Sequence, residues 1–319
     1  MTLDIILLIV GLALIVLGAN YLVDGASSIA RRSGLSEFVI GLTIVGIGTS
    51  TPEMVVSFMS AFNGESEMAV GNVVGSNIFN TLVILGITAL ISPIAITRTN
   101  LRKDIPLNII VTVMMIVLGL NATIFGYGDN TLNRWDGLLM LAIFVWYIIS
   151  SVKGGKTDQN QPDEGIKTYS IALSSFMIVI GISGLVFGGR LFVNSATSLA
   201  EMAGISKKFI AITIFAAGTS MPELATSIVA AVKGRNQLAL GNILGSNIFN
   251  IILILGGSAV IHPLDVGGMG YVDLGLLLLA AIIIMLSAYT FRKKEIDRAE
   301  GTILLLLEAA YMWYLIANI

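Results

Sequence analysis

Long apolar runs, interrupted by short loops that hold most of the charges, make up almost the whole of this 319-residue chain. A helix that crosses a bilayer needs about 20 predominantly apolar residues. Inside lipid the backbone has no water to bond, so runs of this length can only form helices that satisfy their own hydrogen bonds. Only 12% of the residues are charged, against about a quarter in soluble domains. The sequence therefore predicts an all-α integral membrane protein.

A sliding window of about 19 residues divides the chain into ten predicted transmembrane helices. Their approximate spans are 3–23, 36–62, 67–92, 104–125, 135–152, 168–198, 206–232, 237–261, 271–290 and 300–318. The first run lacks the basic leader and small-residue cleavage site of a removed signal peptide, so we interpret it as a spanning helix. The hydrophilic residues 153–167 are predicted to be a flexible linker between two halves, residues 1–152 and 168–319.

The basic residues fall on alternate loops. Fourteen of the eighteen lysines and arginines lie in the loops after the first, third, fifth, seventh and ninth predicted helices, and three lie in the other loops. Cytoplasmic loops carry the excess of basic residues in membrane proteins. The pattern predicts a multi-pass protein of the cell membrane with a cytoplasmic linker and both termini on the non-cytoplasmic side.

An internal repeat relates the two halves. Residues 41–80 and 211–250 align without a gap at an offset of 170, and 19 of the 40 positions are identical. Five predicted helices separate equivalent points, and an odd number inverts the second copy in the membrane. Two inverted five-helix repeats are a transporter architecture, with the substrate site near the midplane between the copies. Duplication kept for packing alone is the alternative, which the polar character of the matched positions disfavours.

The first shared motif is Gly-Thr-Ser-x-Pro-Glu, at residues 48–53 and 218–223. A proline in a helix interior removes one hydrogen bond and pushes away the carbonyl four residues earlier. The carbonyls next to be loosened belong to Thr49 and Thr219. Free carbonyls at membrane depth occur where they line a cavity or are buried in protein.

The motif ends in Glu53 in the first copy and Glu223 in the second. A carboxylate inside the membrane is costly unless it is paired, and no basic residue lies at a matching depth on these two helices. A bound cation is the natural partner, because Ca²⁺ and Na⁺ prefer oxygen ligands, and two carboxylates balance one divalent ion. The alternative is a pair of protonated glutamates hydrogen-bonded in a packed core.

The second shared motif is Gly-Asn-x-x-Gly-Ser-Asn-Ile-Phe-Asn, at residues 71–80 and 241–250. Its glycines have the small-xxx-small spacing that lets helices approach closely. In each copy a serine and an asparagine four residues apart share one helix face and could add neutral oxygens to the site: Ser76, Asn80, Ser246 and Asn250. Interhelical hydrogen bonding without ion contact is the alternative. Asn72 and Asn242 look more like packing groups, and the motif assigns no clear role to Asn77 or Asn247.

Other classes of function find little support. A net charge of −2 gives no basic surface for nucleic acid. The chain has no cysteine and one histidine, so thiolate and histidine-based zinc sites are not expected. A channel and an intramembrane enzyme remain rival classes, but there is no zinc-protease motif, and broken helices in inverted copies fit alternating access better. Arg190, Asn194 and Glu308 are expected to snorkel or to bond locally.

The runs GIGTSTPE and AAGTSMPE, each followed by GNxxGSNIFN, resemble the α-repeats of the sodium/calcium exchanger family. This family belongs to the calcium/cation antiporter superfamily. The resemblance covers both repeats and the ten-helix layout. The proton-coupled branch typically carries Gly-Asn-Ala-x-Glu at the glutamate position, so Thr-Ser-x-Pro-Glu favours the sodium-coupled branch.

The resemblance implies four cation positions at mid-membrane. The central calcium site would use the carboxylates of Glu53 and Glu223, the carbonyls of Thr49 and Thr219, and the amides of Asn80 and Asn250. One flanking sodium site would use Ser50 and Ser76 with carbonyls near Gly46, and the other Ser220 and Ser246 with carbonyls near Ala216. Some relatives, including potassium-dependent ones, have aspartate where this chain has Asn250, which argues against a potassium requirement. The first and sixth helices would slide across the rest, and the linker is too short to hold calcium-sensing domains.

The sequence thus predicts a membrane antiporter, not an enzyme, that exchanges Na⁺ for Ca²⁺ by alternating access. An antiporter of H⁺ and Ca²⁺, or of H⁺ and another divalent cation, is the alternative. Exchange is obligatory if the helices slide only when the two negative charges are neutralised, and protons are expected to compete with the cations. No cofactor is expected beside the transported ions, membrane lipid surrounds the chain, and the sequence is compatible with a monomer.

Overall fold

The structure is a computed structural model that describes residues 2–126, 128–154, 167–203, 216–290 and 294–317. The regular elements of these residues are helices, apart from four strands of two residues each. The prediction of an all-α protein is confirmed at this level. The linker prediction, residues 153–167, falls almost wholly outside the described residues, as do Lys207, Lys208, Arg292 and Lys293, so the division into two domains stays a prediction.

The elements of the first half follow the predicted spans, except that the first helix continues ten residues past the predicted end at residue 23. In chain order, with π-helical segments marked η, they are α1 (Thr2–Ser33), α2 (Glu37–Ile40), η1 (Gly41–Val45), α3 (Gly46–Thr49), α4 (Thr51–Phe62), α5 (Ser66–Phe79), η2 (Asn80–Ile84), α6 (Leu85–Ile91), β1 (Ile94–Ala95), η3 (Asn100–Asp104), α7 (Ile105–Gly119), α8 (Asn121–Phe125), β2 (Thr131–Leu132) and α9 (Arg134–Gly154).

The second half repeats most of this order where it is described, without counterparts of η3 and α8 among its described elements. Its elements are α10 (Ile171–Met202), α12 (Ala216–Thr219), α13 (Met221–Val232), α14 (Asn236–Phe249), η5 (Asn250–Leu255), α15 (Gly256–Ile261), β3 (Leu264–Asp265), α16 (Tyr271–Ser287), β4 (Glu295–Ile296) and α17 (Arg298–Ala317).

Six described helices are long and apolar enough to cross a membrane, and seven if the bent pair Glu37–Thr49 and Thr51–Phe62 is one span. Two shorter apolar helices, α13 and α16, add to these. The chain is therefore a multi-pass membrane protein. The count of ten remains a prediction, because the start of the predicted seventh helix lies outside the described residues.

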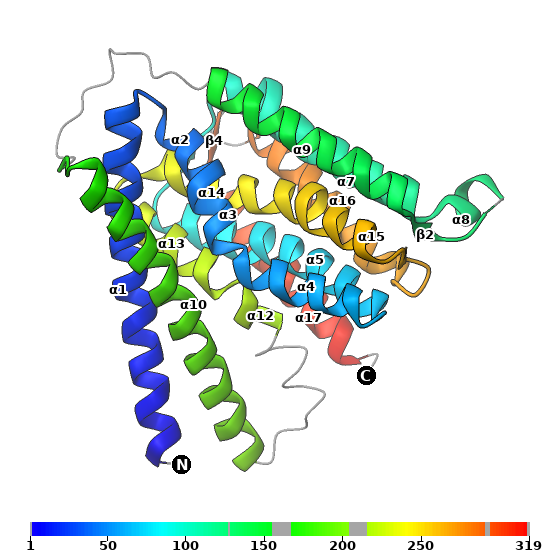
Figure 1. Cartoon of the computed structure of the whole chain (residues 1–319), viewed down its shortest axis with the longest axis horizontal. Coiled ribbons are helices and arrows are strands. Elements are labelled where there is room, and N and C mark those ends of the chain that lie inside the picture. The colour runs from blue at the N-terminus through cyan, green and yellow to red at the C-terminus, as the bar shows by residue number, and fades with distance from the viewer. Residues whose placement is uncertain (1, 127, 155–166, 204–215, 291–293, 318–319) are drawn as a thin grey trace.

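Helices α1 and α10 pack side by side and run in opposite directions (Figure 1). Their contact is made by glycines, since a Cβ on Gly18 would lie 2.7 Å from the carbonyl oxygen of Gly181, and one on Gly11 would lie 2.8 Å from that of Gly188. Gly181 is the repeat equivalent of Gly11, and Gly188 that of Gly18. The two contacts are therefore exchanged by the repeat, and no side chain fits between the two backbones.

The short strands show the same reciprocity. β1 pairs antiparallel with β4, and β2 pairs antiparallel with β3. β1 and β3 are separated by the repeat offset of 170 residues, so each pairs with a strand of the opposite half. Close helix contacts follow the same rule: Gly137 of α9 lies against Gly256 of α15, and Gly301 of α17 lies against Gly86 of α6.

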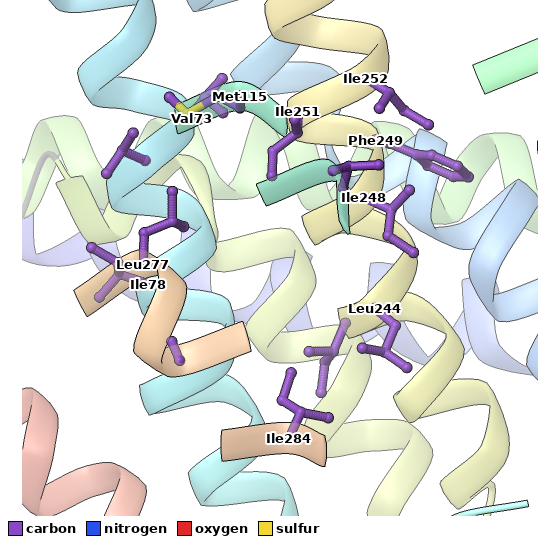
Figure 2. Close-up of a cluster of buried hydrophobic side chains, with 14 of the residues drawn as sticks. Val73, Ile78, Met115, Leu244, Ile248, Phe249, Ile251, Ile252, Leu277 and Ile284 are labelled. Atoms are coloured by element: carbon purple, nitrogen blue, oxygen red, sulfur yellow. The ribbon is translucent and has the colours of Figure 1, made fainter. Parts of the chain in front are cut away.

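The helix formed by α14, η5 and α15 is the centre of the molecule. Of its apolar window, 94% is buried, against 22% for α1 and 33% for α10. Side chains of α5, α7 and α16 pack around it: in Figure 2 Val73 and Met115 lie toward Ile251, and Ile284 lies toward Leu244. The second copy of the second motif is thereby placed on the most buried of these helices, the first copy lies on a helix with 67% of its apolar window buried, and α1 and α10 lie at one side.

The glycine contact between α1 and α10 makes a direct prediction about stability. In Gly188→Ala the added Cβ meets backbone atoms of α1, including the nitrogen of Ile15 at 2.9 Å, and we expect a loss of about 1–3 kcal/mol. Gly189 is the matched control on the same helix, because nothing lies within 4 Å of its added Cβ. Alanine there should be neutral or gain up to about 1 kcal/mol. Thermal unfolding in detergent, followed by size-exclusion chromatography, measures both, and equal melting temperatures would contradict the contact.

Candidate cation-binding site

Both glutamates lie just after a break in a helix. Ser50 separates α3 from α4, and Ser220 separates α12 from α13. The backbone has ψ 10° at Ser50 and ψ 8° at Ser220, far from the helical value near −42°. Pro52 and Pro222 stand in the first turn of the new helix, where a missing N–H has no intrahelical partner to lose. The prolines thus begin helices, which corrects the prediction that they interrupt a helix interior.

The break leaves two backbone carbonyls open. The N–H groups of Met54 and Leu224 donate to the serine carbonyls at 3.0 Å, so helical bonding resumes there. Between described residues, no backbone hydrogen bond crosses either break to the carbonyl of Thr49 or Thr219. Polar groups buried without a partner are costly. These two carbonyls are available to a ligand.

The two halves exchange hydrogen bonds at the glutamates. The Ser50 hydroxyl donates to Oε1 of Glu223 at 2.8 Å, and the Ser220 hydroxyl donates to Oε1 of Glu53 at 3.1 Å. Each glutamate is 1% exposed. In both, Oε2 is buried and has no hydrogen-bond partner among the described residues. Each carboxylate is thus held at one oxygen by the opposite half, and its other oxygen is left for something else.

The serines group across the halves. The hydroxyl oxygens of Ser50 and Ser246 lie within hydrogen-bond distance of each other, at 3.0 Å, and Ser246 lies 3.4 Å from Oε1 of Glu223. Gly46 lies against the same helix, since a Cβ there would be 3.4 Å from the Ser246 nitrogen. The sequence grouped Ser50 with Ser76 instead, and that grouping has no support among the described contacts. Ser76 is buried on α5, which α12 contacts.

The remaining predicted ligands are placed less completely. Asn80 and Asn250 are each 1% exposed, and they are the first residues of η2 and η5. Asn250 donates to Asn77 at 2.9 Å, whereas both amide atoms of Asn80 and the amide oxygen of Asn250 have no partner among the described residues. Thr219 is half-buried. The backbone of Ala216 begins α12, and its side chain lies outside the description.

Two asparagines that looked like packing groups hold the glutamates' backbone. Asn72 donates to the carbonyl of Glu53 at 3.1 Å, and Asn242 donates to that of Glu223 at 3.4 Å. Each also donates to a serine four residues after its glutamate, at 2.9 and 3.0 Å. Asn242 further accepts from the Thr49 hydroxyl at 3.1 Å. The sequence contained a signal for this role, because Ser57 and Ser227 follow the glutamates by four residues and so share their helix face in both copies.

The donor set is rich in oxygen and poor in nitrogen and sulfur. No group of three or more histidine, cysteine, aspartate or glutamate side chains gathers anywhere in the described ranges. Two carboxylates with hydroxyl, amide and carbonyl oxygens suit Na⁺ or Ca²⁺ rather than zinc. Arg190 and Asn194 are exposed on α10, and Glu308 is half-buried on α17, so none of the three is seen in this cluster.

The sequence model of the family described as sodium/calcium exchanger protein matches residues 3–153 and 173–317. The chain belongs to the sodium/calcium exchanger family. This family consists of membrane transporters, and the resemblance found in the sequence motifs is confirmed.

Relatives of this exchanger chain match over nearly its full length. The putative antiporter CaxA of Alkalimonas amylolytica is 37% identical over 327 residues, with 98% of each chain covered. The sodium/calcium exchanger MaX1 of Methanosarcina acetivorans is 32% identical over 347 residues, again with 98% of each covered. Among solved structures, the sodium-calcium exchanger NCX_Mj, soaked with 10 mM Na⁺ and zero Ca²⁺, superimposes with a TM-score of 0.83 at 30% identity, covering 100% of this chain and 99% of that one.

Cysteine pairs test the contact between Ser50 and Ser246, because the chain contains no cysteine of its own. Their hydroxyls are 3.0 Å apart, so Ser50→Cys with Ser246→Cys should form a disulfide on mild oxidation. Ser50→Cys with Ser76→Cys should stay reduced. Mass spectrometry of the digested protein reads both pairs. Oxidation of the second pair but not the first would restore the grouping predicted from the sequence.

Proposed function

We propose that this protein is a sodium/calcium antiporter that exchanges Na⁺ for Ca²⁺ by alternating access to one buried site. The observation that carries the proposal is the pair of buried glutamates, Glu53 and Glu223. Each is bonded at one oxygen by a serine of the opposite half, and the other oxygen of each has no hydrogen-bond partner among the residues that the structure describes. A site that is reached from both halves can open to one face or the other as the halves move.

Electrostatics favours a cation between these glutamates. Both carboxyl groups are buried, each 1% exposed, and each is reached by a serine hydroxyl of the opposite half. Removing charges from water is expensive, and opposite charge close by is what offsets the cost. One Ca²⁺ neutralises both carboxylates. Sodium ions can do the same with the help of hydroxyl and carbonyl oxygens, because Na⁺ also prefers oxygen ligands.

The proposed ligands divide into one central and two flanking sets. The central Ca²⁺ set comprises the carboxylates of Glu53 and Glu223, the carbonyls of Thr49 and Thr219, and the amides of Asn80 and Asn250. The contact of Ser50 with Ser246 supports a regrouping of the flanking Na⁺ sets across the halves. One then comprises Ser50, Ser246, Glu223 and the carbonyl near Gly46, and the other Ser220, Ser76, Glu53 and the carbonyl near Ala216.

The proposed architecture is ten helices in two inverted repeats, residues 1–152 and 168–319. Support comes from the exchanged glycine contacts of α1 and α10 and from the strands β1 to β4, which pair across the halves. A pseudo-two-fold relation produces such reciprocal contacts. With the basic loops cytoplasmic, both termini are placed on the non-cytoplasmic side.

Sodium is the proposed counter-ion. The Thr-Ser-x-Pro-Glu motif favours it, and two similar proteins, MaX1 and NCX_Mj, are named for sodium/calcium exchange. Coupling to protons is the second candidate, because the name of the similar protein CaxA states antiport without stating the ions. Exchange is obligatory if α1 and α10 move only when the glutamate charges are neutralised.

Neutralising either glutamate should abolish exchange. We expect ⁴⁵Ca²⁺ uptake into Na⁺-loaded liposomes to fall at least about tenfold in Glu53→Gln and in Glu223→Gln, since loss of one charge weakens cation binding by more than about 1.4 kcal/mol. Glu308→Gln is the matched control, because Glu308 lies on α17, a different helix from those that carry the cluster. It should retain uptake. Equal loss in all three variants would remove the reason for assigning the site to the first two.

Measuring uptake with a Ca²⁺ gradient alone and with a pH gradient alone identifies the counter-ion. A Ca²⁺ gradient should drive ²²Na⁺ uptake at equal pH on both sides, and a pH gradient without Na⁺ should drive no ⁴⁵Ca²⁺ uptake. Proton-driven ⁴⁵Ca²⁺ uptake that needs no Na⁺ would establish the second candidate in place of the first.

Protons should compete with Ca²⁺ at the glutamates, because a protonated carboxyl no longer attracts a cation. Acidifying both sides equally is expected to raise the Ca²⁺ concentration that gives half-maximal uptake. Saturating Ca²⁺ should recover the maximal rate. Uptake that stays unchanged well below neutral pH would contradict competition.

A further inference from the structure

Asn77 lies in the last turn of α5 and is 2% exposed. The sequence motif gave it no clear role. Both ends of its amide contact the central helix of the opposite half. Its Nδ2 donates to the backbone carbonyl of Asn247 at 3.0 Å, and its Oδ1 accepts from Nδ2 of Asn250 at 2.9 Å.

These two bonds fix the direction of the amides. A backbone carbonyl oxygen can only accept a hydrogen bond, so Asn77 must turn its NH₂ group toward Asn247. Its oxygen is then the atom that meets Asn250, and Asn250 must offer its own NH₂ group in return. The amide oxygen of Asn250 is thereby left over, buried and without a hydrogen-bond partner among the described residues.

We propose that Asn77 is a positioning residue that presents the amide oxygen of Asn250 to Ca²⁺. The proposal rests on the antiporter function proposed above. Asn250 follows Ser246 by four residues and so shares its helix face, and Ser246 donates to Glu223 at 3.4 Å. If Asn250 were turned over, its NH₂ group would face the cation and repel it. A reversed Asn250 would also set oxygen against oxygen at Asn77.

We call the two bonds that run from the carbonyl of Asn247 through Asn77 to Asn250 the relay. The equivalent positions of the other half do not form it. Asn247 is the repeat equivalent of Asn77, but it donates to the hydroxyl of Thr81 at 2.8 Å instead of to a backbone carbonyl. The equivalent of Thr81 in the second copy is Ile251, which has no hydroxyl. A hydroxyl both donates and accepts, so it does not impose a direction on Asn247.

The side-chain amides of Asn80 and Asn250 in the proposed central site therefore differ in how they are oriented. Both amide atoms of Asn80 and the amide oxygen of Asn247 have no hydrogen-bond partner within the part of the chain that the structure describes. Asn80 therefore has to be oriented by the cation, whereas Asn250 is oriented before the cation arrives. Ligands fixed in advance bind more tightly, because less freedom is lost on binding.

Equilibrium binding of ⁴⁵Ca²⁺ to the purified full-length protein tests the relay. In Asn77→Leu, which keeps the side-chain size but has no amide, we expect the Kd for Ca²⁺ to rise about tenfold, equivalent to about 1.4 kcal/mol. Asn247→Leu is the matched control. It occupies the equivalent position and loses a buried hydrogen bond, yet it keeps the backbone carbonyl that anchors Asn77. Its Kd should stay within about twofold of the wild type.

A double-mutant cycle separates positioning from a general packing defect. In an Asn250→Ala background the relay has no target, so adding Asn77→Leu should leave the Kd unchanged. A packing defect would weaken binding in both backgrounds. If Asn77→Leu does not fold, Asn77→Ala is measured in its place.

The outcomes are distinct for the two proposals. A wild-type protein that binds no ⁴⁵Ca²⁺ overturns the proposed function and the relay together. A wild type that binds Ca²⁺ while Asn77→Leu matches Asn247→Leu, or while the cycle is additive, overturns the relay and leaves the antiporter proposal standing.

Discussion

The burial of two carboxylates among apolar helices is the constraint that the rest of this fold has to meet. Each ionised group loses its water, and in the membrane no solvent is close enough to replace it. The protein gives each carboxylate a serine hydroxyl from the opposite half, at 2.8 Å for Glu223 and 3.1 Å for Glu53. That is enough to orient the group and too little to satisfy it. Three features hold the incompletely bonded carboxylates in place: the helix breaks, the hydrogen bonds between the halves and the close packing of glycines.

Asparagine is the residue that stabilises the region around the glutamates. An amide can donate at one end and accept at the other, so it links a backbone group to a side chain with a defined direction. Asn72 and Asn242 use this property to hold the glutamate backbones, and Asn77 uses it between the central helices. Buried polar networks of this kind are costly when incomplete and rigid when satisfied. Among the described residues, the proposed ligands Glu53, Glu223, Asn80 and Asn250 each keep at least one buried atom without a partner, whereas the amide nitrogens of Asn72, Asn242 and Asn77 are bonded.

The sequence predicted the helical class, the repeat and the two glutamates, because these depend on patterns along one chain. Apolar length decides the spans, and the duplicated Gly-Thr-Ser-x-Pro-Glu motif marks the breaks. What the sequence could not supply was the partner of each polar group in the opposite half. Ser50 meets Ser246 because α3 packs on α14, and no spacing within one repeat contains that information. The same holds for Asn77, whose role depends on a carbonyl that every residue possesses and that only the fold selects.

The strand pairing has a consequence for the order in which the chain can assemble. β1 and β2 lie in the first half, at residues 94–95 and 131–132, but their partners lie at residues 295–296 and 264–265. During synthesis the early helices can enter the bilayer one after another, whereas both strands of the first half must wait for most of the remaining chain. Contacts so distant in sequence close slowly. A ribosome that stops after the first half would release helices already in lipid whose four edge residues have nothing to bond, a species that quality control in the membrane could recognise as unfinished.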